Sequence, residues 1–358
     1  MSLFSVGTKL LRKLPAEEAH KTTIRALKTG LVLAPHRPPL PNSLRVTLPK
    51  SGLILSNPVG LAAGFDKDAE AFRAMFDFGF GMVECGTVTP RPQKGNPKPR
   101  LFRLTEDKAV INRMGFNNGG LAAFAARISR HDALDGILGA NVGANKDSED
   151  RVADYVAGIK AVYAYADYVT INISSPNTPG LRGLQDRDAL ETLLTACGDI
   201  ARQLGQDLEV SKPLFLKVAP DLDDEAIADI SGVVEAQADW LKGLIVSNTT
   251  IARPDSLQNK NKGEGGGLSG APLMAPSTEI LRKFAGRLFG KVDLIGVGGI
   301  GSGADAYEKI KAGAHAVQLY SMLVYEGPVL ADRINRELAD LLKADGFDTV
   351  AEAAGSGL

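Results

Sequence analysis

Two different patterns of hydrophobic and polar residues follow one another along this chain of 358 residues. Over residues 3–14, Leu, Val and Phe recur close to helical spacing with Lys and Arg between them, which predicts an amphipathic helix. Pro15 suits the first turn of a second helix, which the pattern extends to about Leu33. Prolines crowd the end of this first segment, residues 1–41, and predict a stiff linker to the rest of the chain.

The main domain, residues 42–358, alternates short apolar runs with helix-length stretches. Residues 45–48 and 53–55 predict a β-hairpin, because a turn-forming stretch separates them. Eight strands are then predicted at residues 59–63, 82–87, 138–142, 169–173, 214–218, 243–247, 294–297 and 316–319. Helices are predicted between them, for example over residues 68–76, 149–166, 223–236 and 304–312. Eight such units predict a closed (β/α)8 TIM barrel. An open doubly wound sheet is the alternative, but no GxGxxG follows the first strand.

Composition is that of an ordinary globular chain, with 44% hydrophobic and 23% charged residues. The formal net charge of −1 gives no reason to expect nucleic acid as a partner. Cys85 and Cys197 are too few for a disulfide framework or a cysteine metal cluster, and no metal is expected. The sequence shows neither an apolar run of the roughly 20 residues that span a bilayer nor a signal peptide. We therefore expect a soluble or peripheral protein made in the cytoplasm.

Charge is unevenly distributed along the chain. The first 37 residues carry seven Lys or Arg against Glu17 and Glu18, a net of +5, which leaves −6 for the remainder. Basic amphipathic helices suit the surface of an anionic bilayer, at about 1 kcal/mol per basic residue near that surface.

In a barrel of this kind, chemistry lies at the carboxyl ends of the strands. After the seventh predicted strand, the Gly-rich run at residues 296–300 predicts a loop that opens a helix. Such loops bind phosphate through free backbone N–H groups, and barrels commonly place a phosphate at this position. We therefore expect a phosphate-bearing ligand there. The second Gly-rich run, residues 266–270, is as often a flexible loop as a ligand contact.

Lys217 lies inside an apolar strand, which is costly unless an anion or a Schiff base meets the side chain. Three interpretations stay open from the residues alone: a Schiff-base nucleophile, a cation beside a flavin ring, or a structural ion pair. Amide and hydroxyl side chains near the strand ends suit a planar heterocycle such as a pyrimidine, and Lys67 could bind its carboxylate. These side chains are Asn112, Asn172, Asn177, Asn248 and Thr249.

Ser175 stands in the run Ser174-Ser-Pro-Asn-Thr178. No Gly-x-Ser-x-Gly elbow surrounds it and the chain has only four His, so a hydrolase triad is not expected. Serine is a weak base because its hydroxyl is hardly ionised near neutral pH. As a base it would need a bound water, a relay such as Thr178, or an oxidising ring nearby.

Together these motifs closely resemble the quinone-linked, class 2 type of dihydroorotate dehydrogenase, over residues 20–342. The most specific pieces are Asn112-Arg-Met-Gly-Phe-Asn117, Asn172-Ile-Ser-Ser-Pro-Asn-Thr178, Ser247-Asn-Thr-Thr250, Gly267-Leu-Ser-Gly270 and Val317-Gln-Leu-Tyr-Ser321. Class 1 members of the family have cysteine where this chain has Ser175, and they lack the N-terminal extension. Both differences favour class 2.

The resemblance implies oxidation of (S)-dihydroorotate to orotate in de novo pyrimidine biosynthesis, with FMN as hydride acceptor and a membrane quinone as final acceptor. It implies FMN contacts at Ala63, Gly64, Lys67, Thr87, Asn141, Asn172, Lys217, Ser247, Gly270, Gly299, Tyr320 and Ser321. It implies substrate contacts at Lys67, Asn112, Arg113, Met114, Gly115, Phe116, Asn172, Asn177, Asn248 and Thr249. Ser175 would then take the C5 proton while a hydride leaves C6. The long polar loops at residues 176–185 and 252–266 are candidate lids.

The same resemblance gives the N-terminal helices a role as a quinone tunnel lined by His20 and Arg103. Taken alone, His20 would be interpreted as an ordinary surface histidine of a helix. The resemblance also implies a monomer that lies peripherally on the cytoplasmic side of the cell inner membrane.

Three alternatives remain open. Another FMN-dependent TIM-barrel oxidoreductase would share the phosphate loop but would not turn over dihydroorotate. A Schiff-base barrel lyase would be colourless, and borohydride with substrate would trap it at Lys217. A non-catalytic membrane-binding scaffold would explain the basic helices but would leave Lys217 and the asparagines without a purpose.

Overall fold

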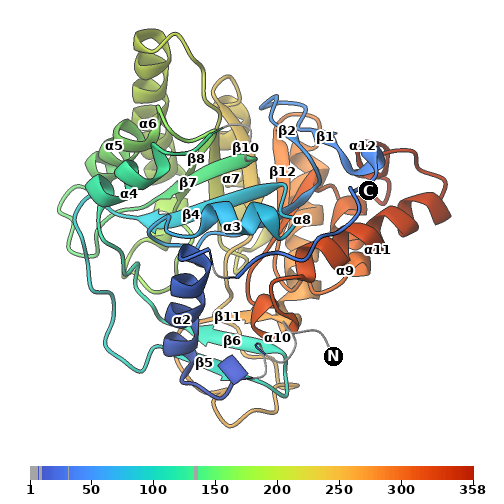
Figure 1. Ribbon diagram of the computed structural model, residues 1–358. Coiled ribbons are helices and arrows are strands. Elements are labelled where there is room, and N and C mark those ends of the chain that lie inside the picture. Colours follow the sequence, from blue (N-terminus) through green and yellow to red (C-terminus); the bar gives the residue numbers. More distant parts are fainter. Residues whose placement is uncertain (1–6, 8–9, 31, 133–135) are drawn as a thin grey trace.

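The centre of the computed structural model, which describes residues 7, 10–30, 32–132 and 136–358, is a closed barrel of eight parallel strands (Figure 1). The order around the barrel is β10-β12-β13-β3-β4-β7-β8-β9. The strands are β3 (Val59–Leu61), β4 (Met82–Val88), β7 (Ile137–Val142), β8 (Tyr168–Asn172), β9 (Leu214–Val218), β10 (Leu241–Val246), β12 (Asp293–Val297) and β13 (Ala316–Leu319). The predicted TIM barrel is therefore confirmed.

Helices surround the barrel and cover the outer faces of its strands (Figure 1). They are α3 (Phe72–Asp77), α4 (Leu121–Ile128), α5 (Arg151–Val162), α6 (Arg187–Asp207), α7 (Asp224–Ala236), α8 (Met274–Leu288), α9 (Gly303–Lys311), α10 (Leu323–Glu326), α11 (Leu330–Ala344) and α12 (Val350–Ala353). Short 3₁₀ helices in the described ranges are η1 (Asn42–Leu44) before β1, η2 (Arg182–Gln185) before α6, and η3 (Ala271–Leu273) before α8. The helix predicted from residue 68 begins only at Phe72. The Asp66 carboxylate accepts the N–H groups of Glu70 (2.8 Å) and Ala71 (2.7 Å), which holds the preceding turn outside the helix.

The barrel interior changes from apolar to polar along its axis. Towards the amino ends of the strands, the rings of Tyr168 and Phe215 pack 4.9 Å apart in a closed apolar cluster. Because successive side chains of a strand point to opposite faces, the next inward residues on β8 are Thr170 and Asn172. The inward residue after Phe215 on β9 is likewise Lys217. Polar groups are thus brought to the carboxyl end of the barrel by the pleat alone.

The predicted β-hairpin is present, and it closes the amino end of the barrel. Strands β1 (Val46–Thr47) and β2 (Ile54–Leu55) pair antiparallel, and the side chains of Val46 and Leu55 join the interior cluster. The turn between them is fixed because Asp293 at the start of β12 accepts the N–H groups of Lys50 (2.9 Å) and Ser51 (2.8 Å). Ligands therefore have the carboxyl end as their entrance.

A three-stranded antiparallel sheet at that carboxyl end was not predicted. Its strands are β5 (Leu101–Leu104), β6 (Ala109–Asn112) and β11 (Gly267–Gly270), in the order β11-β6-β5. Of the two alternatives for residues 266–270, the flexible loop is excluded, because Gly267–Gly270 pairs along its whole length with Asn112–Ala109 of β6. The paired residues lie 155 to 161 positions apart in the chain, so no local pattern reveals their pairing.

The N-terminal segment lies against this small sheet. Helix α2 (Ala16–Lys28) is next to β5, on the side of the barrel opposite the hairpin (Figure 1). It ends five residues before the predicted Leu33, because Thr29 and Gly30 form a turn in which Gly30 has a φ of 69°. Most of the first predicted helix lies outside the described residues, although residues 7, 10 and 11 are helical. Among the helices of the described ranges, none combines the length and the apolar character needed to cross a membrane.

Candidate active site

One cavity of about 690 Å³ lies at the carboxyl ends of the barrel strands and continues beneath α2. Its barrel end is lined by Ala63, Gly64, Lys67, Thr87, Asn112, Met114, Gly115, Phe116, Asn172, Ser175, Asn177, Lys217, Asn248, Thr249, Ser269, Tyr320 and Ser321. Its other end is mainly apolar and is lined by Leu11, Ala16, Ala19, Ala26, Leu27, Val32, Leu33, Leu101, Val110, Leu323 and Val324, with Arg12, His20 and Arg103 among them. Most of the residues predicted for the substrate, the cofactor and the tunnel therefore border one continuous space.

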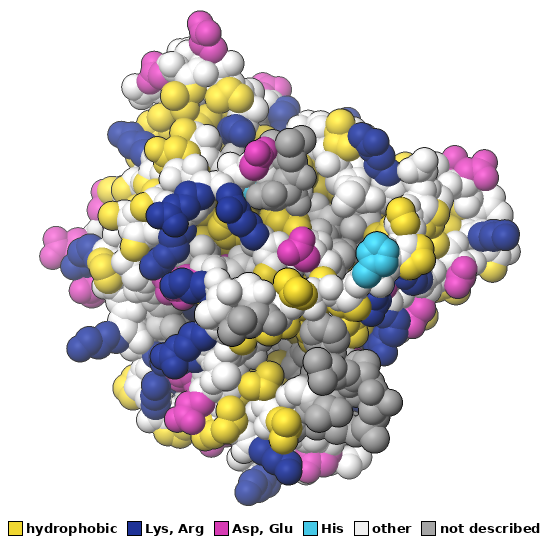
Figure 2. All heavy atoms as spheres, viewed as in Figure 1, with side chains coloured by type: hydrophobic (Ala, Val, Ile, Leu, Met, Phe, Trp, Pro, Cys, Tyr) yellow, Lys and Arg dark blue, Asp and Glu magenta, His cyan; other side chains and the backbone are white. Residues whose placement is uncertain are grey.

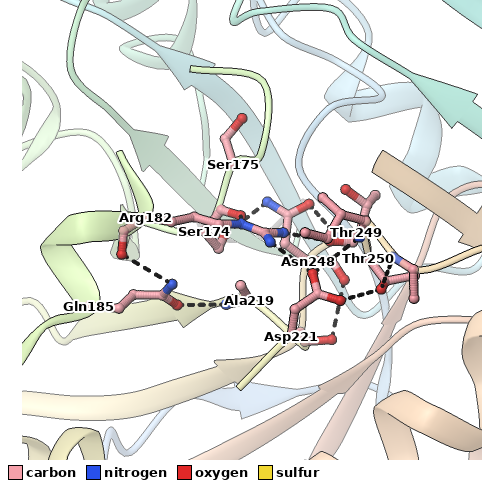
Figure 3. Close-up of polar contacts among 12 residues, drawn as sticks. Ser174, Ser175, Arg182, Gln185, Ala219, Asp221, Asn248, Thr249 and Thr250 are labelled. Atoms are coloured by element: carbon pink, nitrogen blue, oxygen red, sulfur yellow. Dashed lines mark hydrogen bonds and ion pairs between the residues drawn. The ribbon is translucent and has the colours of Figure 1, made fainter. Parts of the chain in front are cut away.

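Hydrogen bonds between loops fix the asparagines at the strand ends. The amide oxygen of Asn172 accepts the Ser174 hydroxyl at 2.6 Å, and the amide nitrogen of Asn248 donates to that same hydroxyl at 2.8 Å (Figure 3). The Asn172 amide nitrogen donates to Thr87 Oγ1 at 2.8 Å. These contacts tie the ends of β4, β8 and β10 together, so the amides are held in place before any ligand arrives.

Two further polar residues extend this set. Asn177 donates from its amide nitrogen to the backbone oxygen of Asn112 at 3.1 Å. The hydroxyl of Thr249 is buried at the cavity and has no hydrogen-bond partner in the described part of the chain. Since buried polar groups are almost always paired, an unpaired hydroxyl at a cavity wall indicates a place for a polar ligand.

Ser175 lies at the cavity wall with only 5% of its surface exposed. Its Oγ accepts the backbone N–H of Asn177 at 3.2 Å. Its side chain points away from the contacts that Ser174 and Arg182 make on the other side of the loop (Figure 3). The hydroxyl is thus oriented by the backbone of its own loop.

Lys217 shares the barrel interior with Glu84, a buried carboxylate on β4. The ammonium lies 3.9 Å from Glu84 Oε1, too far for a hydrogen bond. Burial lowers the pKa of Lys217, and the charge of Glu84 acts in the opposite direction. Glu84 is itself satisfied by the Asn141 amide at 2.7 Å and by the hydroxyls of Tyr168 at 3.0 Å and Thr170 at 3.1 Å. The lysine therefore keeps donors free for a group in the cavity.

Lys67 is the second lysine at the cavity. Its ammonium donates to the backbone oxygen of Gly64 at 2.7 Å. Burial lowers its pKa to about 8, although the nearby charge of Asp68 partly offsets this. A cation with a depressed pKa at a cavity wall gains from an anionic ligand, which restores the missing counter-charge.

A smaller cavity of about 80 Å³ adjoins the first and is bordered by the Gly-rich loop after β12 together with Ser247, Gly270 and Ser321. Gly298 and Gly299 have φ values of 115° and 79°, and a Cβ at Gly299 would lie 2.5 Å from Met274. Only glycine fits there. The backbone N–H groups of Gly299 and Ile300 donate to no acceptor within the described ranges, which is the arrangement that binds a phosphate.

His20 faces the cavity, so its interpretation as an ordinary surface histidine is wrong. Its ring meets the ring of Phe65 edge-on at 5.5 Å, and its Nδ1 lies 3.5 Å from the Tyr320 hydroxyl. Burial, with the charge of Lys67, lowers its pKa to about 3. Arg103 donates to the backbone oxygen of Leu14 and thereby joins the small sheet to the N-terminal segment.

Two of the predicted residues do not line either cavity. Arg113 forms an ion pair with Glu264 at 2.7 Å and lies over the Phe102 ring at 4.6 Å, so its side chain is turned away from the other substrate candidates. Asn141 lies behind the wall, where its oxygen accepts the Thr87 hydroxyl at 2.5 Å. Asn141 can therefore act on a ligand only through its neighbours.

Sequence reasoning missed Glu84, Arg182 and the ion pair between Glu17 and Arg100. A signal existed for Glu84. It is a charged residue in the middle of an apolar strand and so needs a partner of opposite charge, and Lys217, in the middle of another apolar strand, could be that partner. No signal existed for Arg182. Its three partners, Ser174, Asp221 and Thr249, lie far apart in the chain, with 75 positions between the first and the last.

Comparisons with known proteins agree with this geometry. A family model described as dihydroorotate dehydrogenase matches residues 43–342. The dihydroorotate dehydrogenase (quinone) of Xanthobacter autotrophicus is 53% identical over 357 residues, which cover 99% of each chain. That of Rhodospirillum rubrum is 53% identical over 99% of this chain and 94% of its own. Among solved structures, a DHODH from Eimeria tenella in complex with ferulenol is 43% identical and superposes with a TM-score of 0.90 over 95% of both chains.

Proposed function

The chain belongs to the dihydroorotate dehydrogenase family, and from this premise we propose which end of its cavity serves each half of the reaction. The reaction oxidises dihydroorotate to orotate in pyrimidine biosynthesis, with FMN as cofactor and a quinone as acceptor. The observation that supports the division is that the larger cavity runs continuously from the polar barrel mouth to the apolar space beneath α2. Dihydroorotate is polar and charged, whereas a membrane quinone is largely apolar.

The residues present fit FMN. The Gly-rich loop with its free N–H groups suits the phosphate. Lys217, whose ammonium has no hydrogen bond within the described residues, lies at the cavity wall where the ring would bind. When bound there, FMN supplies the acceptor for the hydride that leaves C6 of dihydroorotate. The residues that would hold it are Ala63, Gly64, Lys67, Thr87, Asn172, Lys217, Ser247, Gly270, Gly299, Tyr320 and Ser321, with Asn141 behind Thr87.

The substrate is held by the polar set at the barrel mouth. Lys67 binds the carboxylate, and the unpaired hydroxyl of Thr249 gains a partner in the pyrimidine ring. The other contacts come from Asn112, Met114, Gly115, Phe116, Asn172, Asn177 and Asn248. Arg113 supports this group from outside through its contacts with Glu264 and Phe102.

Ser175 is the base that takes the C5 proton of dihydroorotate. It borders the cavity between the amides and is oriented by the Asn177 N–H. The proton leaves to the serine while the electron pair of the C5–H bond forms the new double bond of orotate. Thr178, whose hydroxyl is buried without a partner in the described residues, is available to pass that proton onward.

The N-terminal segment, residues 1–41, admits the quinone. His20 and Arg103 lie at the apolar end of the cavity, between α2 and the barrel. Lys and Arg side chains gather around α2 on the face shown in Figure 2, with hydrophobic side chains between them. This combination suits peripheral binding to an anionic bilayer. From the family likeness we further propose a monomer on the cytoplasmic side of the cell inner membrane.

The experiment that tests this function compares electron acceptors. Purified protein is given dihydroorotate with a soluble quinone, with fumarate or with NAD, and orotate is measured. Turnover with the quinone alone is expected. Turnover only with fumarate or NAD would leave the flavin-dependent barrel dehydrogenase in place and overturn the role of the N-terminal segment. A yellow protein that oxidises no dihydroorotate would overturn the proposed function as a whole.

A further inference from the structure

The guanidinium of Arg182 joins three of the loops that follow barrel strands. Its Nε donates to the Ser174 backbone oxygen at 3.1 Å, and its Nη2 donates to the Thr249 backbone oxygen at 2.9 Å (Figure 3). Its Nη1 binds the Asp221 carboxylate at 2.8 Å. Ser174 follows β8, Asp221 follows β9 and Thr249 follows β10. One planar cation therefore fixes the relative positions of three loops.

The carboxylate of Asp221 strengthens this connection. Besides Arg182, it accepts the hydroxyl of Thr250 and the backbone N–H of Ile251 at 3.1 Å. The loop after β10 is thus bound twice, once directly by Arg182 and once through Asp221. Both side chains of the ion pair are about one-fifth exposed, so they lie at the edge of the site rather than in the barrel core.

Gln185 fixes the other end of the 3₁₀ helix that carries Arg182. Its side chain is buried, and its oxygen accepts the backbone N–H of Ala219 at 2.9 Å. The helix η2 is consequently held at both of its ends, by Arg182 at one and by Gln185 at the other (Figure 3). A guanidinium anchored in this way is a rigid reference point for the loops that it binds.

The two carbonyl groups that Arg182 binds lie next to functional residues. The Ser174 carbonyl belongs to the peptide that joins Ser174 to Ser175, so a rotation of that peptide would move the Ser175 side chain. The Thr249 carbonyl is part of the residue whose unpaired hydroxyl faces the cavity. Arg182 itself does not line the cavity.

On the basis of the function proposed above, we propose that Arg182 is a positioning residue that holds Ser175 in register with Thr249. The base and the substrate contact come from different strands, and no direct hydrogen bond joins the two side chains within the described residues. Arg182 supplies the link through their backbones. A lysine at this position has one nitrogen and cannot reach three acceptors in a plane, so it would keep the charge and lose the alignment.

The test measures anaerobic flavin reduction by saturating dihydroorotate in Arg182→Lys. A misplaced base is expected to slow this step about 10- to 100-fold. Reoxidation by quinone, FMN content and thermal midpoint are expected to stay close to those of the unsubstituted protein. Arg187→Lys is the matched control, because Arg187 pairs with Glu191 at 3.2 Å and Asp229 at 3.1 Å on the exposed surface and binds no loop carbonyl in the described part of the chain.

A double variant separates positioning from a general structural effect. If Arg182 acts through Ser175, adding Arg182→Lys to Ser175→Ala should slow flavin reduction by less than about threefold further. If the double variant is slowed by the product of the two single-variant factors, the proposal is overturned. Flavin reduction at the unsubstituted rate in Arg182→Lys, or an equal loss in quinone reoxidation or FMN content, would also overturn it.

Flavin reduction in the unsubstituted protein shows whether a failure concerns this inference or the proposed function. If that protein is not reduced by dihydroorotate at all, the proposed function fails and the Arg182 variants are not needed to show it. If it is reduced normally and Arg182→Lys behaves in the same way, the function stands and only the role of Arg182 is overturned.

Discussion

The two ends of the cavity are built in different ways. At the barrel mouth, side chains from three strand ends meet in hydrogen bonds of 2.6–2.8 Å, as between Asn172, Ser174 and Asn248. Beneath α2 the wall consists mostly of leucine, valine and alanine. There the described part of the N-terminal segment is held to the barrel by separate polar contacts, such as those of Glu17 with Arg100.

This difference follows from what each end has to bind. A polar ligand has to exchange its hydrogen bonds with water for equally good ones, so its partners must be held in place beforehand. An apolar ligand needs only a shaped space from which water has been removed, which a docked helix can supply. We therefore expect changes at the barrel mouth to act on dihydroorotate oxidation and changes at α2 to act on quinone reduction.

The largest effect is expected when Ser175, the proposed base at the barrel mouth, is replaced. Ser175→Ala should retain yellow FMN but slow flavin reduction by dihydroorotate about 10²- to 10⁴-fold, the range that positioned proton transfer supplies. Stopped-flow absorbance under anaerobic conditions measures the reduction. Reoxidation of chemically reduced protein by quinone serves as the internal control and should be unchanged. A normal rate of reduction would remove Ser175 as the base.

Removal of residues 1–37 tests the apolar end of the cavity in the same way. Quinone turnover should fall at least about tenfold, and binding to anionic liposomes should be lost with the basic residues. Flavin reduction by dihydroorotate should survive, because the asparagines and Ser175 are fixed by the barrel loops. Truncated protein that turns over quinone normally would show that the apolar end of the cavity is not the quinone site.

A smaller effect is expected from the titration of Lys67. Burial holds its pKa at about 8 in the ligand-free protein, so its charge is complete below that pH and is lost as pH rises through it. KM for dihydroorotate should therefore rise up to about tenfold per pH unit above 8, because only the protonated form binds the carboxylate well.

The matched variant for this titration is Lys67→Arg. Its guanidinium does not titrate in this range, so the break in the pH profile of KM should disappear. The KM for quinone should show no such break in either protein. A KM for dihydroorotate that stays constant up to pH 9.5 would separate Lys67 from the substrate carboxylate.

Sequence patterns predicted the barrel well because a parallel strand buried on both faces is a local, near-continuous apolar run. The strand Leu214–Val218 was predicted to the residue for this reason. The small sheet escaped prediction because Gly267–Gly270 is a poor strand by composition and finds its partner, β6, only in three dimensions. The end of α2 was misplaced because apolar residues continue to Leu33, although that side chain is 76% exposed.

The candidate site was predictable in its residues but not in its connections. Lys217 and the asparagines stand out at strand ends, and the barrel necessarily brings those ends together. The side-chain direction of Arg113 could not be predicted, since it depends on Glu264 in a distant loop. Without the resemblance, His20 would be interpreted as exposed, because a helix pattern does not show which neighbours cover it. In the structure Phe65 and Tyr320 do so.

The smallest expected effect tests the attachment of α2 itself. Arg100, only 6% exposed, binds both carboxylate oxygens of Glu17 at 2.9 and 3.0 Å, and this hydrogen bonding lowers the pKa of Glu17 to about 2. Because the pKa lies below the ordinary 4.5, the stabilisation is complete above pH 4.5 and is lost as pH falls through about 2. Glu17→Gln should weaken the docking of α2 by about 2 kcal/mol, the usual contribution of hydrogen bonds to a charged group.

Glu17→Gln should accordingly lower quinone turnover by a few-fold and leave flavin reduction unchanged. Hydrogen exchange of the α2 amides should become faster at pH 7 in this variant, whereas α2 of the unsubstituted protein should remain protected down to pH 4. Glu18→Gln is the matched control, since Glu18 lies in the same helical turn and is exposed. Equal effects of the two substitutions would mean that the local charge of the segment, rather than its attachment to Arg100, governs quinone access.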